Sequence, residues 1–477
     1  MRTTREFPLP LIILIPLGIG LALSLAPRPV VLQEDLSVAR QVTGGATGNG
    51  QASRLQDVLA WEPWRTTLWE TIGEKYLESG NLAPAIKAFQ TAEDLGMLSS
   101  QGWKAMGDAE LALGDWQAAV SDWREVLDSS QGASDGLFSQ VLSQQWDHRA
   151  FPDALKTALD WSEKRPQTSQ AWFKAGLLEC VENPTDAPQY LAKAAGLDTS
   201  LKPQSDALSQ AIQTAYQQDH EGYRRVVVGR ALANLGYWDL AQKSFEIATV
   251  SSPDYAEGWA FLSEALQQTN QDGSAALKKA QALDPNSIVV KGFTALWERS
   301  NNQVDAAFDE LKQIAQLQPD QAVWQIELGN TVVMQGDLTV ALQYYQHATE
   351  LEPSNPQTWM ALANFSAVNL TQLQEVGLPA ARTALTLTSN SAEALDLMGR
   401  VMLGLEDTAS AERFLQQAID KDASYAAAYL HLGQLYLDEK QPDKAYPLIK
   451  KASDLAGSDA ETGMFAKRLL DRYFGGQ

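Results

Sequence analysis

The chain has 477 residues and a formal net charge of −22; 45% of its residues are hydrophobic and 20% are charged. A single compact core rarely extends over so many residues, so the length indicates several domains or an elongated array. The ordinary composition excludes a wholly disordered chain. The negative charge argues against nucleic acid as a partner, because phosphate binding needs a basic surface. The single cysteine, Cys180, excludes an internal disulfide framework and a cysteine-cluster zinc site.

The N-terminus predicts a membrane anchor. Residues 1–7 contain Arg2 and Arg5, and the segment Pro8–Ala26 that follows carries no charge. As a helix this segment is about 28 Å long, which is enough to span a bilayer core. The cationic residues precede the span, so the positive-inside rule makes residues 1–7 a cytoplasmic tail and places most of the chain outside the cytoplasm. Arg28 and Arg40 lie beyond the span and weaken this orientation.

Two alternatives to a single-pass transmembrane anchor stay open. One is a cleaved signal peptide: Ala26 is a small residue of the kind found at cleavage sites, although Pro27 makes a poor context for cleavage. The other is a segment that is buried or lies at the membrane surface.

Residues 27–63 are predicted to form a flexible linker, because the stretch VTGGATGNGQAS at 42–53 is rich in Gly, Ser and Thr. It is not a phosphate-binding loop, since neither Lys-Ser nor Lys-Thr follows Gly50. Trp61 and Trp64 stand at the end of this stretch. They either cover the exposed end of the first helix pair or form an aromatic patch that binds a partner or lipid.

Four residue types recur in one phase from about residue 66 to residue 459, often at intervals of 34 residues. Such a period is the signature of a repeat architecture. The glycines are Gly73, Gly107, Gly176, Gly229, Gly329, Gly399 and Gly433. The alanines are Ala85, Ala119, Ala154, Ala241, Ala307, Ala341, Ala411 and Ala445. The aromatic residues four before the glycine place are Trp69, Trp103, Trp172, Trp259, Trp359 and Tyr429. The prolines are Pro166, Pro253, Pro285, Pro319 and Pro353.

One repeat reads as a helix hairpin. Apolar residues recur at three- and four-residue spacing through 323–334, which predicts an amphipathic helix. Gly336 ends this helix, because glycine accepts the left-handed conformation. A second helix runs over about 338–351 and stops before Pro353.

The small residues explain how the two helices pack. We expect Gly329 and Ala341 to face each other and to let the two backbones approach closely. Tyr345 is expected to fill the space toward the next hairpin. Each hairpin then has an apolar face that it cannot bury alone, so hairpins must stack.

This pattern resembles the tetratricopeptide repeat (TPR) family, and residues 66–99, 222–255, 322–355 and 426–459 carry most of the motif. The resemblance implies an all-α, right-handed superhelical solenoid of about eleven helix-turn-helix repeats, beside the N-terminal transmembrane helix. We expect a first repeat block at 64–202, an extra helix that interrupts the array at 203–221, a second block at 222–459 and a capping helix at 460–477. The unit at 288–321 fits the motif poorly.

The sequence shows no sign of an enzyme. Motifs of metalloproteases, serine hydrolases, phosphate loops and dinucleotide-binding folds are missing from the 477 residues. The four histidines are scattered, without a second His or a Cys at ligand spacing. We therefore expect no catalytic residues, no metal and no cofactor.

The resemblance implies a scaffold that binds a protein or peptide in a concave groove, and no nucleic acid. An alternative is a carbohydrate-binding accessory module of an envelope enzyme or polysaccharide assembly machine. Place 9 of the first helix commonly faces the groove in TPR proteins. The predicted partner-binding residues at place 9 are therefore Asn330, Asn364, Arg400 and Gln434. Earlier units have Glu74, Asp108 and Glu264 there, which confines the predicted site to the C-terminal half.

Overall fold

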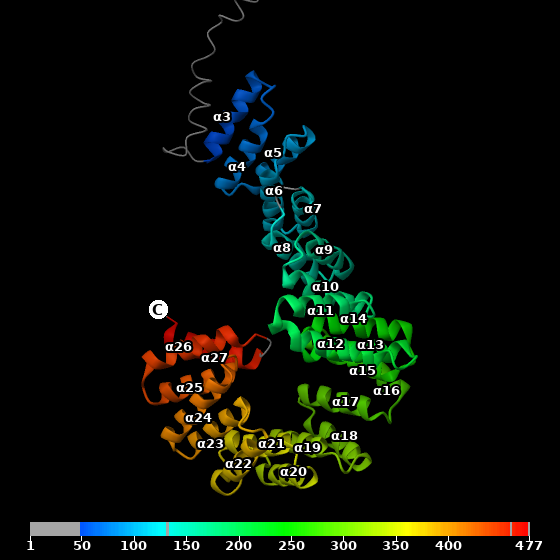
Figure 1. Cartoon of the computed structure of the whole chain (residues 1–477), viewed down its shortest axis with the longest axis vertical. Helices are drawn as coiled ribbons and strands as arrows, with labels where there is room; N and C mark the ends of the chain where they lie inside the picture. The colour runs from blue at the N-terminus through cyan, green and yellow to red at the C-terminus, as the bar shows by residue number, and fades with distance from the viewer. Residues whose placement is uncertain (1–47, 130–132, 458–459, 476–477) are drawn as a thin grey trace, which may run out of the picture. The chain divides into compact units, whose positions relative to one another are not determined.

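The structure is a computed structural model that describes residues 48–129, 133–457 and 460–475 (Figure 1). Within these ranges it contains 25 α-helices, one 3₁₀ turn and one π-helix, and no strand. The predicted tail at 1–7 and the predicted span Pro8–Ala26 lie outside the described residues. Among the residues that are described, no helix combines the length and the apolar composition that a membrane crossing requires.

The chain divides into two compact units. Unit one comprises residues 1–182 and 189–202, and unit two comprises residues 183–188 and 203–477. The helices of unit one are α3 (Gly48–Trp61), α4 (Leu68–Glu78), α5 (Leu82–Asp94), α6 (Ser100–Ala112), α7 (Trp116–Asp128), α8 (Asp135–Asp147), α9 (Phe151–Lys164), α10 (Ser169–Glu182) and most of α11 (Ala187–Leu197), followed by the 3₁₀ turn η1 (Thr199–Leu201).

The helices of unit two are α12 (Lys202–Ala215), α13 (Glu221–Asn234), α14 (Trp238–Ser251), α15 (Ala256–Gln268), α16 (Ser274–Leu283), α17 (Ile288–Ser300), α18 (Val304–Leu317), α19 (Ala322–Gln335), α20 (Leu338–Leu351), α21 (Pro356–Asn369), α22 (Leu378–Leu387), α23 (Ala392–Gly404), α24 (Thr408–Lys421), α25 (Ala426–Asp438), α26 (Pro442–Leu455) and α27 (Ala460–Phe474); the π-helix η2 (Leu373–Gly377) precedes α22. Apart from α3, α12 and α27, the described helices form eleven consecutive hairpins. The prediction of an all-helical solenoid is confirmed.

Each repeat glycine lies under a large side chain of the second helix of its own hairpin. A Cβ atom added at Gly329 would lie 3.0 Å from the ring of Tyr345, and one at Gly229 would lie 2.4 Å from the ring of Phe245. The Tyr345 ring covers Gly329 and also stacks on Phe365 of the next hairpin at 4.8 Å. The same arrangement joins Gly73 to Phe89, Gly107 to Trp123, Gly399 to Leu415 and Gly433 to Ile449. In two equivalent hairpins the repeat alanine also lies close to the glycine: a Cβ at Gly107 would lie 2.9 Å from the carbonyl oxygen of Ala119, and one at Gly399 would lie 3.4 Å from that of Ala411.

The aromatic residue four before the glycine clamps the loop that enters its helix. The indole N–H groups of Trp172, Trp259 and Trp359 donate to the carbonyl oxygen of the proline six residues earlier, at 2.8–3.0 Å. These three rings are only partly buried. Trp123, which covers Gly107, is fully buried.

The linker prediction is wrong for Gly48–Trp61, which forms α3. Ala52, Leu55, Val58 and Leu59 recur at helical spacing, and all four are buried against α4 and α5. The glycine-rich start of the stretch concealed this apolar stripe. Residues 27–47 of the predicted linker lie outside the described residues.

Three other departures from the regular array take definite forms. Helix α12 occupies the segment predicted as an extra helix. After α21 the chain forms the π-helix η2, whose entry needs the left-handed conformation at Leu370 and Gln372 (φ 48° and 46°). Helix α27 packs on α26, where the rings of Tyr446 and Phe474 lie 5.1 Å apart.

Candidate functional site

The first helices of the hairpins line one side of unit two. Helix α15 contacts both α13 and α17. In the second half of the unit, α19 contacts α21, α21 contacts α23, and α23 contacts α25. In Figure 1, α17, α19 and α21 follow the inner side of the curve of this unit, and α18, α20 and α22 follow its outer side. Side chains at equivalent places of the first helices therefore meet on a common inner face.

The structure brings two of the predicted partner-binding residues into direct contact. Nη1 of Arg400 on α23 donates to Oδ1 of Asn364 on α21 at 2.8 Å. These residues stand at the same place of consecutive hairpins. The contact joins the place-9 side chains of these two neighbouring hairpins directly.

Asn330 instead contacts residues of its own hairpin. Its Oδ1 accepts a hydrogen bond of 2.5 Å from the hydroxyl of Tyr345, and its Nδ2 donates to Glu327 at 3.4 Å. Burial, together with the charge of Glu327, raises the pKa of Tyr345 to about 12, so the phenol is protonated and donates at physiological pH. Gln434, the fourth predicted residue, is half-buried on α25.

The place-9 positions form a longer series than the sequence suggested. Leu296 on α17 stands 34 residues before Asn330, and it lines a surface cavity together with Glu264 of α15. Arg230 of α13 stands 34 residues before Glu264. We call this series the groove row; its members are Arg230, Glu264, Leu296, Asn330, Asn364, Arg400 and Gln434.

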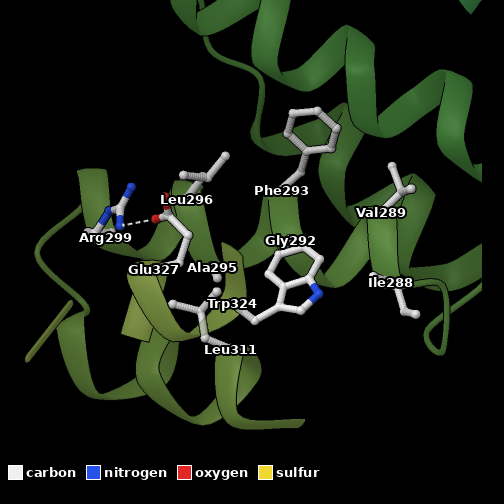
Figure 2. A pocket seen from close by; sticks show the side chains of 10 residues that line it. All are labelled: Ile288, Val289, Gly292, Phe293, Ala295, Leu296, Arg299, Leu311, Trp324 and Glu327. Atoms are coloured by element: carbon white, nitrogen blue, oxygen red, sulfur yellow. Dashed lines mark hydrogen bonds and ion pairs between the residues drawn. The ribbon is translucent and has the colours of Figure 1, made fainter. Parts of the chain in front are cut away.

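A largely apolar cavity of about 300 Å³ opens beside the groove row (Figure 2). It is enclosed by α17, α18 and α19, and its lining residues are Ile288, Val289, Gly292, Phe293, Ala295, Leu296, Arg299, Leu311, Trp324 and Glu327. In Figure 2, the ring of Trp324 lies beside Gly292, while Phe293 and Leu296 project from α17. Sequence reasoning missed this cavity, because the unit at 288–321 fits the repeat motif poorly.

The lack of a side chain at Gly292 leaves room for the cavity. Leu311, which lines it, takes the place that Phe245 and Tyr345 hold in two other hairpins and that Leu415 and Ile449 hold in two more. Gly292 has no side chain, and a Cβ there would meet only the Trp324 ring, at 3.9 Å. A glycine in the middle of an apolar helix, outside the repeat columns, is the signal that could have identified the site.

An ion pair closes one end of the cavity. Nη1 of Arg299 donates to Glu327 at 2.7 Å, and both side chains are about a quarter exposed. Figure 2 marks this contact with a dashed line. Through the contact between Glu327 and Asn330, the cavity borders directly on the polar part of the groove row.

Trp61 and Trp64 do not cover the first hairpin. Each is 70% exposed, and α3 provides the cover instead. Within the described parts of the chain, no group of three or more His, Cys, Asp or Glu side chains could hold a metal ion.

Models of the tetratricopeptide repeat family match residues 71–135 and 402–465. No curated protein matches the chain. Among solved structures, the chain is similar to the APC/C hetero-tetramer Cut9–Hcn1 (16% identity, 92% of this chain and 95% of that chain, TM-score 0.42). It is also similar to yeast Tom70 (14% identity, 93% of this chain and 95% of that chain, TM-score 0.43). A tetratricopeptide repeat protein from Parabacteroides merdae is similar as well (11% identity, 55% of this chain and 99% of that chain, TM-score 0.40).

One matched segment lies in each unit, and both contain the glycine and alanine columns described above. Tetratricopeptide repeats typically form non-enzymatic scaffolds that bind protein partners. The chain carries tetratricopeptide repeats.

Proposed function

We propose that the chain is a non-catalytic scaffold that binds an extended peptide segment of a partner protein along the groove row. The hydrogen bond between Arg400 and Asn364 carries this proposal, because side chains of successive hairpins that contact each other are close enough for one ligand to touch both. The shared cavity of Glu264 and Leu296 supports the same conclusion at the other end of the row.

The chemistry of the polar part suits a peptide backbone. The Oδ1 atoms of Asn330 and Asn364 already accept hydrogen bonds. Their Nδ2 groups can donate to ligand carbonyl oxygens, and the remaining guanidinium N–H groups of Arg400 can pair with a ligand carboxylate. A carbohydrate is the second candidate ligand, and the Trp324 ring at the cavity supports it, since sugars stack on aromatic faces. The amide and arginine residues of the row favour the peptide.

Asn364 and Arg400 provide the test. The double variant Asn364→Ala/Arg400→Ala is expected to weaken partner binding by about 1–3 kcal/mol, because each net hydrogen bond contributes roughly 0.5–1.5 kcal/mol. Asn330 is unsuitable, because its removal would leave the Tyr345 hydroxyl without its acceptor. The readout is the affinity for the partner or, before one is known, for peptides selected on the wild-type chain from a random display library.

A matched control is Gln343→Ala/Arg382→Ala, which removes an exposed amide and an exposed arginine from the second helices α20 and α22. Equal affinities of the test variant and this control would reject the groove row as the binding surface. Binding of oligosaccharides but of no peptide would favour the carbohydrate alternative.

We also propose that Pro8–Ala26 anchors the chain in a membrane with the repeats outside the cytoplasm. The support is the uncharged segment and the two arginines before it. Protease added to intact cells, or to spheroplasts if an outer membrane intervenes, should digest the repeats. Protection of the repeats there, with digestion after lysis, would reverse the orientation.

A further inference from the structure

We infer that the cavity between α17 and α19 anchors a bulky apolar side chain of the bound segment, and that Glu264 binds a basic side chain about three residues away from it. This inference rests on the proposed function and specifies the ligand of the same face. It assigns a role to the first part of the groove row, whereas the sequence pointed only to the polar part.

The lining of the cavity selects for an apolar group. Ile288, Val289, Phe293 and Trp324 contribute mainly carbon atoms, and the one ion pair, between Arg299 and Glu327, is internally compensated. A volume of about 300 Å³ lies at the lower end of the range for ligand sites. It suits one large side chain rather than an extended cofactor. Aromatic side chains gain most from such a site, because they bury the largest apolar area.

The cavity is continuous with the groove row. Leu296 is a row member that lines both this cavity and the neighbouring one shared with Glu264, and it is 38% exposed. Met334 of α19, also on the neighbouring cavity, is 51% exposed. A segment that lies along the row therefore passes over the mouth of the cavity and can insert a side chain without leaving the row.

Charge complementarity indicates the neighbouring residue of the ligand. Glu264 lies on the rim with Gln268, which donates to its carboxylate at 2.7 Å. The nearby Arg299 is already paired with Glu327. Among the residues that line this neighbouring cavity, Glu264 is the one carboxylate. Arg230, the preceding row member, has its guanidinium over the Phe261 ring at 5.2 Å. The chain as a whole carries −22, which attracts basic segments.

The spacing follows from helix packing. Adjacent helices such as α15 and α17 lie about 8–10 Å apart, and an extended peptide advances about 3.3–3.6 Å per residue. The side chain that meets Glu264 on α15 is therefore about three residues from the one in the cavity.

The experiment uses a random peptide display library, selected in parallel on the full-length wild type and on variants. Wild-type selection should enrich peptides with an aromatic, Leu or Met residue about three positions from an Arg or Lys. Gly292→Leu fills the cavity from an accessible helix position, and we expect it to weaken the selected peptides by at least about tenfold. Leu296→Ala, at a partly exposed residue, should weaken them by several fold. Glu264→Gln should remove the preference for Arg or Lys and retain the apolar residue.

Gly136→Leu is the matched control, because Gly136 is an exposed helical glycine of α8 in unit one with open space around it. Circular dichroism verifies that each variant is folded. If selected peptides lose affinity with Asn364→Ala/Arg400→Ala but bind Gly292→Leu and Leu296→Ala as they bind wild type, the anchor is wrong and the scaffold function stands. If no peptide is selected, or if the Asn364/Arg400 variant binds normally, the proposed function itself fails. Selection of apolar residues without a spaced basic residue would overturn the role of Glu264.

Discussion

Gly329 and Gly292 are both helical glycines of unit two, and their surroundings differ. A Cβ at Gly329 would lie 3.0 Å from the Tyr345 ring, whereas one at Gly292 would lie 3.9 Å from the Trp324 ring. Gly329→Leu is therefore expected to destabilise the fold by about 1–3 kcal/mol or more through overpacking. Gly292→Ala should stabilise it by about 0.5–1 kcal/mol through helix propensity. Chemical denaturation measures the free energy of unfolding of both variants. Equal changes in that free energy for the two variants would contradict the packing described.

Glu110 of α6 and Asp122 of α7 form a buried pair of carboxyl groups in unit one, and the two side chains share a hydrogen bond. Burial, the adjacent Glu110 and the more distant Glu93 and Glu125 raise the pKa of Asp122 to about 8. Between its ordinary pKa of 3.8 and 8, the folded state retains a proton that the unfolded state has lost. The stability of this region should therefore fall as the pH rises through that range.

Asp122→Asn tests this pH dependence, because an amide cannot ionise. The variant should protect the amides of α6 and α7 from hydrogen exchange better than wild type does, and the difference should grow from pH 5 to pH 8. The exposed Asp128→Asn on the same helix serves as the control. A difference that stays constant with pH would show that no proton is retained by the pair.

The place-9 residues could be predicted from the sequence, because the repeat spacing fixes their position on each first helix. Their partners could not. Tyr345 reaches Asn330 and Arg400 reaches Asn364 through side-chain conformations that depend on the stacking of hairpins. The prediction treated all four side chains as equivalent donors. The structure separates the partly buried hydrogen bonds of Asn330 from the exposed pair of Asn364 and Arg400.

At the scale of elements, α3 is the clearest test of how unit one begins. Leu55 is fully buried between α3 and the first hairpin. Leu55→Ala should cost about 2–5 kcal/mol locally, because it leaves a cavity. Hydrogen exchange of α4 and α5 should accelerate, while the exposed neighbour substitution Gln56→Ala should leave it unchanged. Unchanged exchange in Leu55→Ala would mean that α3 does not support the hairpin.

The hairpins were predictable because a 34-residue period in small and aromatic residues survives variation at any one column. Helix α3 and the cavity were not, for opposite reasons. The Gly- and Thr-rich residues before α3 dominated the composition of residues 27–63 and concealed its apolar stripe. The unit that forms the cavity lacks the repeat glycine, since Ala295 stands there, so the motif gave little guidance on its packing.

At the scale of the whole molecule, the stacking of hairpins predicts that a destabilising substitution affects mainly its own hairpin and the adjacent ones. Phe245 is almost fully buried over Gly229 and stacks on Phe261 at 5.5 Å. Phe245→Ala should cost about 3–5 kcal/mol. Because each hairpin contacts mainly its neighbours, amides of α13–α15 should exchange faster while those of α4–α9 in unit one remain unchanged. Uniform acceleration across both units would instead indicate a single cooperative fold.

The residues around the cavity lower the thermal stability of the solenoid, but they leave the space that a ligand would occupy. Gly292 and Leu311 are positions at which larger side chains would pack more of the interior, and natural proteins often retain such weaknesses where function requires them. Laboratory evolution that selects only for a folded protein at high temperature should therefore introduce larger side chains at residue 292 or 311. The resulting solenoid should be more stable to heat. The same lineages should lose the ability to discriminate among ligands, since the shape that a partner would read is the space that the improved packing removes.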